Sequence, residues 1–271
     1  MKLEILVTTM NQFNFSKIDE MNIQSDVVIA NQSDYCAYDE LETKKGFKAI
    51  MISTTSKGLS RNRNIALAHS NQSADLIMFL DDDVVLNDNY ESIILQEFEE
   101  HPEVDAIKFN MHDLSDVRKL AMKRIERFEK CTRRNMSASG VCGFVIKRRI
   151  IQQYGLHFHE NFGSGTKNYC GEDTIFLQNL INKHVPLYRS PKDIAGIDQT
   201  NSTWFRGFDD KYFYVVGKVF ATIYPRLCRL LAIRSSYRFS KKKECNMNFM
   251  SILKNYNRGI KDILRRRDDS E

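Results

Sequence analysis

One short stretch constrains the fold of this chain more than any other. The apolar run at residues 76–80 ends in Asp81, Asp82 and Asp83, and a short apolar run of this kind predicts a buried β-strand. Ligands of open α/β sheets bind beyond the carboxyl ends of strands, and alternate side chains of a strand share a face, so Asp81 and Asp83 are expected to point together. Two such carboxylates repel each other unless a cation lies between them, and hard oxygen ligands favour Mg²⁺ or Mn²⁺. The alternative is a solvated acidic turn.

Apolar strand patterns alternate with helical patterns through the first half of the chain. We expect strands at 3–7, 27–30, 49–52 and 76–80, and helices at 61–69 and 90–100. Ser60 is expected to cap the first of these helices. The alternation predicts an α/β fold with a mostly parallel sheet flanked by helices.

The second half continues with a predicted strand at 106–110, an exposed charged helix at 117–130 and an inner strand at 142–146. From Glu172 the pattern becomes helical and buries one face. That face is formed by Phe176, Leu177, Leu180 and Ile181. Glu172 and Asp173 are therefore expected in the first turn, where the helix dipole favours acidic residues even without any catalytic role.

The charge of the 271-residue chain is uneven. Residues 211–271 carry 15 Lys and Arg against 5 Asp and Glu, whereas residues 1–210 carry 25 against 30. We therefore expect a domain at 1–210 and a basic helical tail at 211–271. An apolar stripe from Val215 to Leu231, interrupted by Pro225, predicts an amphipathic helix that is kinked or split. This stripe fits either a helix packed on the core or one lying on an anionic membrane.

The chain shows no signal peptide and no uninterrupted apolar stretch of 18 residues, so we expect a cytoplasmic protein. Its six cysteines form no Cys-x-x-Cys pair, which disfavours a structural zinc site.

Three motifs in this order resemble those of family 2 glycosyltransferases with the GT-A fold. They are the segment 58–64, which contains Arg63 and Asn64, the strand ending in Asp81-Asp82-Asp83, and Gly171-Glu172-Asp173 about ninety residues later. The resemblance spans about residues 1 to 215. It implies a catalytic GT-A domain at 1–210.

The resemblance also implies roles for individual residues. It makes Glu172 and Asp173 the catalytic residues, and of these Asp173 corresponds to the base that accepts the proton of the acceptor hydroxyl. The residues that the resemblance places at the nucleotide sugar are Thr8, Asn31, Arg63, Asn64, Asp81 and Asp82. Those placed at a Mn²⁺ or Mg²⁺ ion are Asp81, Asp83 and Asp198. Two positions depart from the family pattern, because Asn31 stands where an acidic residue often grips uracil and no histidine lies near Asp198.

The implied activity is inverting transfer of a hexose from a nucleotide sugar, UDP-galactose or UDP-glucose, to a lipid-linked saccharide. Such enzymes work at the inner face of the cytoplasmic membrane in the synthesis of bacterial capsule, exopolysaccharide or O-antigen. The alternatives are a nucleotidyltransferase, although residues 8–11 lack its glycine-rich basic loop, and a non-catalytic protein that binds nucleotides or polyanions. The basic tail lacks an interleaved stacking platform, so we expect no nucleic-acid partner.

Overall fold

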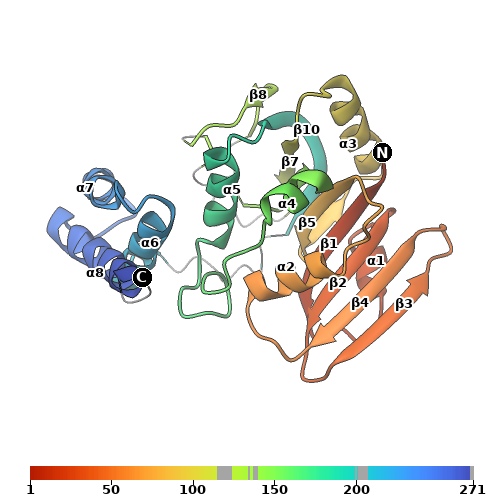
Figure 1. Ribbon diagram of the computed structural model, residues 1–271, viewed down its shortest axis with the longest axis horizontal. Coiled ribbons are helices and arrows are strands. Elements are labelled where there is room, and N and C mark those ends of the chain that lie inside the picture. Colours follow the sequence, from red (N-terminus) through yellow and green to blue (C-terminus); the bar gives the residue numbers. More distant parts are fainter. Residues whose placement is uncertain (115–123, 134, 137–139, 199, 201–206, 269–271) are drawn as a thin grey trace.

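The computed structural model describes residues 1–114, 124–133, 135–136, 140–198, 200 and 207–268. Within these residues a mixed sheet has helices on both faces, and three further helices follow it (Figure 1). The strands are β1 (Leu3–Met10), β2 (Asp26–Gln32), β3 (Ala37–Glu42), β4 (Lys48–Thr54), β5 (Leu76–Asp81), β6 (Val84–Leu86), β7 (Ala106–Asp113), β8 (Glu129–Lys130), β9 (Phe144–Lys147) and β10 (Leu187–Ile197). The helices are α1 (Ser16–Glu20), α2 (Leu59–Ala68), α3 (Tyr90–Glu100), α4 (Arg148–Tyr154), α5 (Glu172–Asn182), α6 (Asp210–Ile223), α7 (Cys228–Phe239) and α8 (Phe249–Asp268).

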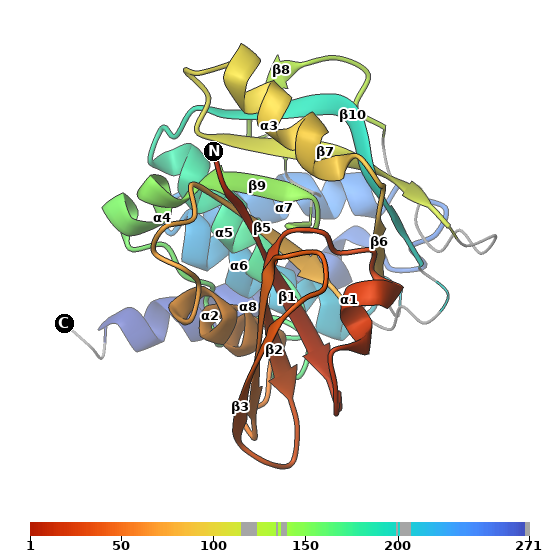
Figure 2. The same cartoon turned by 90° about the vertical axis from the view of Figure 1, so that its right-hand side faces the viewer.

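The strands run in the order β3-β4-β2-β1-β5-β9-β7-β10-β6, and β8 pairs with β10. Figure 2 shows β3 and β10 toward opposite ends of this sheet. The neighbours β4, β2, β1 and β5 are parallel, which confirms the expected arrangement of the first half. Beyond them β9 is antiparallel to both β5 and β7, so the complete sheet is mixed.

β5 is buried on both faces, which explains its continuous apolar run. Its side chains alternate between two cores. Leu76, Met78 and Leu80 belong to the core that includes residues of α1 and α3, and Ile77 and Phe79 belong to the core that includes residues of α2, α4 and α5. Two filled layers therefore hold the strand that ends in the aspartates.

Two local predictions were wrong. The charged helix does not reach residue 130, because residues 124–128 are irregular and β8 follows at Glu129–Lys130; residues 117–123 of that prediction lie outside the described residues. Ser60 does not cap α2 either. Gly58 holds the cap position, and the Ser60 hydroxyl donates instead to the carbonyl of Phe162 at 2.6 Å. This bond ties α2 to the loop that precedes α5.

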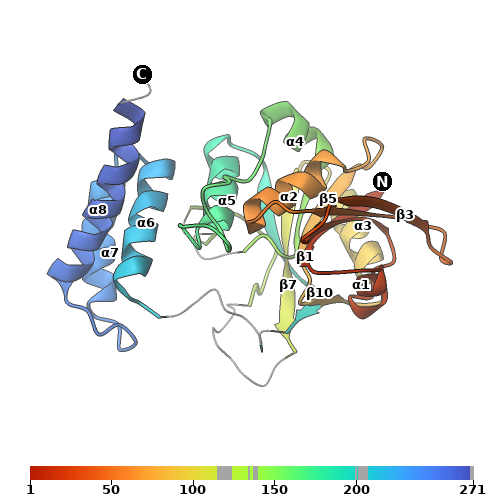
Figure 3. The same ribbon diagram turned by 90° about the horizontal axis from the view of Figure 1, so that it is seen from below.

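The apolar stripe of the tail is divided between two helices, as Pro225 predicted, because α6 ends at Ile223 and α7 begins at Cys228. The part on α6 is packing surface, since Val215 and Val219 are buried. Figure 3 shows α6 beside both α5 and α8. Of the two alternatives left open for the stripe, packing on the core therefore holds for α6. Lys218 of α6 is buried as well, and its ammonium group donates to Asn168 Oδ1 at 3.1 Å.

α6 packs directly against the start of α5. Val219 and Ile223 of α6 lie in one apolar cluster with Phe162 and Ile175. The Tyr224 hydroxyl donates to Gln178 Oε1 at 2.7 Å. The position of α5, which begins with Glu172 and Asp173, thus depends on a helix from the C-terminal part of the chain.

Gly171 is the closest point of this junction, and replacing it tests the packing. Its φ of +104° is strained for other residues, and an added Cβ would overlap the Val219 side chain. We expect Gly171→Ala to lower the free energy of unfolding by about 2 to 5 kcal/mol, from backbone strain and overpacking together. Gly155→Ala is the matched control, because Gly155 also has positive φ, +55°, but has open space around it. Denaturant unfolding of both variants measures the difference, and equal losses would show that α6 does not press on this residue.

Candidate active site

The aspartates of β5 meet two threonines of β1. Thr8 pairs in register with Asp81, and its hydroxyl donates to Asp81 Oδ1 at 3.0 Å. The next hydroxyl, that of Thr9, donates to Asp82 Oδ2 at 2.5 Å. The carboxyl ends of two parallel neighbours therefore orient the first two aspartates, as expected for a site at this edge of an α/β sheet.

Arg63 joins two motifs that lie more than ninety residues apart in the sequence. It projects from α2, is 2% exposed, and its Nη2 lies 2.9 and 3.1 Å from the two carboxylate oxygens of Asp81. Its Nη1 donates to Asp173 Oδ1 at 2.5 Å and lies 3.9 Å from Glu172 Oε1. One guanidinium thus contacts the aspartate of β5 and both acidic residues of α5.

The charged groups around Arg63 shift one another's pKa values. Burial alone would lower the pKa of the Arg63 guanidinium, but Asp173 and Asp81 outweigh it and raise that pKa. Burial would likewise raise the pKa of Asp81, yet Arg63 lowers it overall. Glu172 is different, because burial and the neighbouring Asp173 raise its pKa despite Arg63. Asp81 is therefore held ionised, whereas Glu172 favours its neutral form.

Asp173 combines a fixed position with access to solvent. It lies in the first turn of α5, as predicted, and its Oδ2 accepts the backbone N–H of Val141 at 3.2 Å. Its side chain is nevertheless 24% exposed. A carboxylate held by Arg63 on one oxygen and by a backbone N–H on the other, and partly open to solvent, can receive a proton from a bound molecule.

Asp83 is the carboxylate whose charge is left uncompensated. Its Oδ1 is buried without a hydrogen-bond partner among the described residues. Burial and the nearby Asp81, Asp82 and Asp198 raise the pKa of Asp83 to about 7. Asp198 lies beside it, since its backbone N–H donates to the Asp83 carbonyl at 2.9 Å. An orphaned oxygen among acidic neighbours fits a divalent cation.

No complete metal site is assembled, however. Among the described residues, no three His, Cys, Asp or Glu side chains are arranged to hold a metal ion. Asp81, predicted to share the ion with Asp83, also pairs with Arg63, and its carboxylate has further lone pairs for a cation. Mg²⁺ commonly binds through one or two carboxylates together with substrate phosphates and water, so a partial ligand set suits an ion that arrives with a diphosphate.

Two residues predicted at the nucleotide sugar have supporting positions in the structure. Asn31 is fully buried, and its amide group bonds to the backbone of Gln12 and to the Ser53 hydroxyl. Asn64 exchanges hydrogen bonds with both backbone groups of Phe158, at 2.8 and 2.9 Å. Asn31 therefore shapes the loop after β1, and Asn64 secures the loop before α5.

Sequence reasoning missed an aromatic pair at the loop that follows β1. Phe13 follows β1, is 79% exposed, and stacks on Tyr35, which follows β2, with ring centroids 6.4 Å apart. An exposed aromatic side chain after a parallel strand was a usable signal, because stacking surfaces are common in sites for bases.

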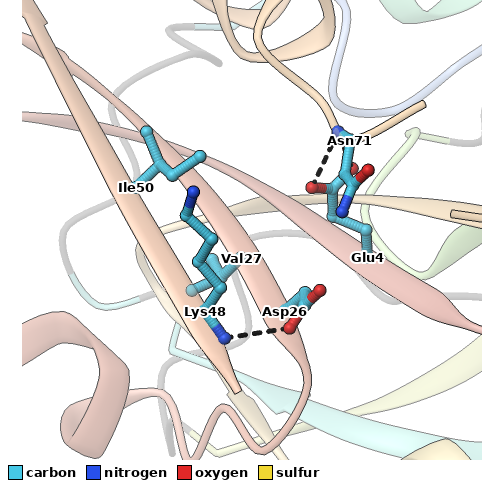
Figure 4. A pocket seen from close by; sticks show the side chains of 6 residues that line it. All are labelled: Glu4, Asp26, Val27, Lys48, Ile50 and Asn71. Atoms are coloured by element: carbon cyan, nitrogen blue, oxygen red, sulfur yellow. Dashed lines mark hydrogen bonds between the residues drawn. The ribbon is translucent and has the colours of Figure 1, made fainter. Parts of the chain in front are cut away.

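The chain also has a cavity at the other end of the sheet, of about 260 Å³ (Figure 4). It lies where β1, β2 and β4 begin. Its lining residues are Glu4, Asp26, Val27, Lys48, Ile50 and Asn71. Burial raises the pKa of Glu4 to about 7, but both of its carboxylate oxygens accept the Asn71 N–H. This cavity is separate from the aspartates at the carboxyl ends of the strands.

Comparison with known proteins bears on the cluster of Arg63, Asp81 and Asp173. Residues 29–155 match the family model described as glycosyl transferase family 2. This matched segment, which we call the family 2 segment, resembles family 2 glycosyltransferases and makes up slightly less than half of the chain. The family 2 segment contains Arg63 and all three aspartates of β5, whereas Glu172 and Asp173 lie beyond it. No curated protein matches the chain.

Solved structures show the same fold around the family 2 segment. Staphylococcus aureus TarS 1–349 in complex with UDP-GlcNAc superposes with a TM-score of 0.63 at 16% identity, over 90% of this chain and 74% of that chain. TarS 1–349 on its own gives 0.61 at 13% identity, over 98% and 92%. A longer TarS chain gives 0.61 at 15% identity, and the present chain covers 44% of it. These likenesses establish the GT-A fold for the family 2 segment and the elements around it.

Proposed function

We propose that this protein is an inverting glycosyltransferase that moves a hexose from a UDP-sugar to a hydroxyl group of a lipid-linked saccharide. The observation that carries the proposal is the contact of Arg63 with both Asp81 and Asp173, since it joins the motif at the end of β5 to the one at the start of α5. The family 2 segment and the fold shared with a UDP-GlcNAc complex support a nucleotide-sugar donor. Candidate donors are UDP-galactose and UDP-glucose, which carry a hexose, and UDP-GlcNAc, the ligand of the TarS complex, which carries the related N-acetylhexosamine.

In this mechanism Asp173 takes the proton of the acceptor hydroxyl while the hydroxyl oxygen attacks the anomeric carbon. The bond between the sugar and the phosphate breaks, UDP leaves with its electron pair, and the configuration inverts. Arg63 holds Asp173 in place, and Thr8 and Thr9 hold Asp81 and Asp82 toward the donor.

We assign Asp83, with Asp81 and Asp198, to holding a Mn²⁺ or Mg²⁺ ion. When bound, the ion would neutralise charge on the leaving diphosphate as a Lewis acid. The orphaned, buried Oδ1 of Asp83 supports this assignment. Phe13, exposed beside Tyr35, is the surface on which we place the base of the nucleotide.

The lipid-linked acceptor places the proposed reaction at the inner face of the cytoplasmic membrane, in the synthesis of a bacterial surface polysaccharide. The basic balance of residues 211–271 supports this location.

Nucleotide binding tests the site directly. We expect the protein to bind UDP in isothermal titration with Mn²⁺ and to bind at least about tenfold more weakly with EDTA, because the ion links carboxylates to diphosphate. Asp83→Asn should remove the difference between the two conditions. Asp88→Asn is the control, because Asp88 is an exposed neighbour that accepts from Asn22.

The same titration with the three candidate UDP-sugars identifies the donor. Wild-type protein that binds none of these nucleotides, with or without metal, would contradict the proposed function. A metal effect that survives in Asp83→Asn would instead contradict the role given to Asp83.

A further inference from the structure

Helix α7 has two unlike faces. Its inward side chains are buried against α6 and α8, and they are Cys228, Ala232, Ser236 and Phe239. The outward apolar side chains, which we call the α7 ridge, are Leu227, Leu230, Ile233 and Tyr237, and they are 51%, 65%, 48% and 64% exposed. Spacings of three and four residues put the ridge on one side of the helix. Four large apolar side chains in one row on a surface indicate a binding surface.

Basic residues flank the α7 ridge. Between residues 226 and 244 the chain has seven exposed basic residues and one acidic residue, Glu244. The basic residues are Arg226, Arg229, Arg234, Arg238, Lys241, Lys242 and Lys243. No ion pair joins any of the seven to another residue in the described part of the chain. With 3.6 residues per turn, Arg229 lies on one side of the ridge and Arg234 and Arg238 lie on the other.

We propose that the α7 ridge and its flanking basic residues are the surface by which this protein docks on an anionic lipid membrane. Apolar side chains of an interfacial helix enter the boundary between head groups and acyl chains, while long basic side chains on both sides reach the phosphates. A charge of +6 over nineteen residues complements an anionic leaflet. The biological purpose of this docking rests on the proposed lipid-linked acceptor.

The position of α7 in the molecule suits such docking. It lies on the far side of α6 from α5 and the sheet (Figure 1). Every helix in the described part of the chain is too short or too polar to cross a bilayer. Contact through α7 therefore requires no rearrangement of the elements that hold Arg63 and Asp173.

The test is co-sedimentation of the full chain with vesicles at 0.1 M salt. We expect binding to vesicles of 30% phosphatidylglycerol and 70% phosphatidylcholine, and about tenfold or more weaker binding to pure phosphatidylcholine. Removing the ridge by Leu230→Ala, Ile233→Ala and Tyr237→Ala together should weaken binding about tenfold or more. Reversing charge by Arg229→Glu and Arg234→Glu should do the same.

Matched controls come from the exposed β3–β4 hairpin at the opposite end of the molecule. They are Tyr38→Ala with Leu41→Ala, which remove exposed apolar side chains, and Lys44→Glu with Lys45→Glu, which reverse exposed charges. Both should bind vesicles like the wild type. Circular dichroism and UDP binding should be unchanged in every variant, because none of these residues belongs to the candidate active site.

Several results would overturn the inference. These are equal binding to neutral vesicles, loss of binding in the hairpin controls, and full binding by the ridge variant. The inference would also fail if the wild type bound no vesicles but formed oligomers that the ridge variant turned into monomers, because the ridge would then be a contact between copies of this chain. Tight salt-dependent binding to RNA without vesicle binding would do so as well. Because UDP titration is a separate measurement, failure of the membrane surface and failure of the proposed function give different results.

Discussion

Asp173→Asn should slow sugar transfer by about 10²- to 10⁴-fold, the usual contribution of a positioned general base. The amide nearly preserves the size of the side chain and can still accept from Arg63, but it cannot take the proton of the acceptor hydroxyl. UDP binding should therefore stay close to that of the wild type. The measurement is the initial rate of transfer of labelled sugar from the donor identified by titration to a lipid extract.

Asp193→Asn provides the matched control, since Asp193 is 28% exposed, close to the 24% of Asp173, and is also paired with an arginine, Arg124. It should keep nearly full activity. Transfer by Asp173→Asn at the wild-type rate would exclude Asp173 as the base, whereas equal losses in both variants would point to a general effect of removing a paired carboxylate.

Arg63→Ala should destabilise the protein by about 3 to 5 kcal/mol, because it leaves buried carboxylates without their cation. Asp81, Asp173 and Glu172 all contact Arg63 or lie within 4 Å of it. The neighbouring Arg61→Ala is the control. Arg61 is 49% exposed and pairs with Glu160 at the surface, so its loss should cost less than about 1 kcal/mol.

The pH dependence of this penalty gives a second readout. Arg63 lowers the pKa of Asp81 in the folded state, so its stabilising effect is present above the unfolded pKa and is lost as the pH falls through the folded one. Urea unfolding of the wild type and of both variants at several pH values measures this effect. The loss in free energy of unfolding caused by Arg63→Ala should be smaller at acidic pH than at neutral pH. A penalty below 1 kcal/mol, or one independent of pH, would contradict the role of Arg63 as the shared cation.

Sequence patterns predicted those helices and strands that are defined by which of their side chains are buried. The strand at 76–80 and the helix from Glu172 were both confirmed, because runs and periodic faces of apolar residues report directly on the core. β10 had no such signal. It contains Pro191 and Gly196, residues that are depleted in strands, and its pairing with β7 is irregular after Arg189.

The partners of polar side chains were less predictable, since they depend on contacts between distant segments. Arg63 was expected beside the nucleotide, and sequence spacing does not reveal that Asp173 lies 2.5 Å away. The stripe of the tail was ambiguous for a related reason. A periodic apolar face shows that a helix is amphipathic, but Val219 packs on Gly171 whereas Leu230 faces solvent, and only the fold distinguishes these outcomes.

Helix α6 fixes the separation between the candidate active site and α7. It lies between α5, which carries Asp173, and the pair α7 and α8, so the width of one packed helix, roughly 10 to 12 Å, separates them. With α7 on a bilayer, the height of Asp173 above the lipid would be set by packed side chains rather than by a flexible linker. Such an enzyme would select acceptors by how far their terminal hydroxyl stands from the membrane, so the length of the saccharide already attached would determine whether another sugar is added.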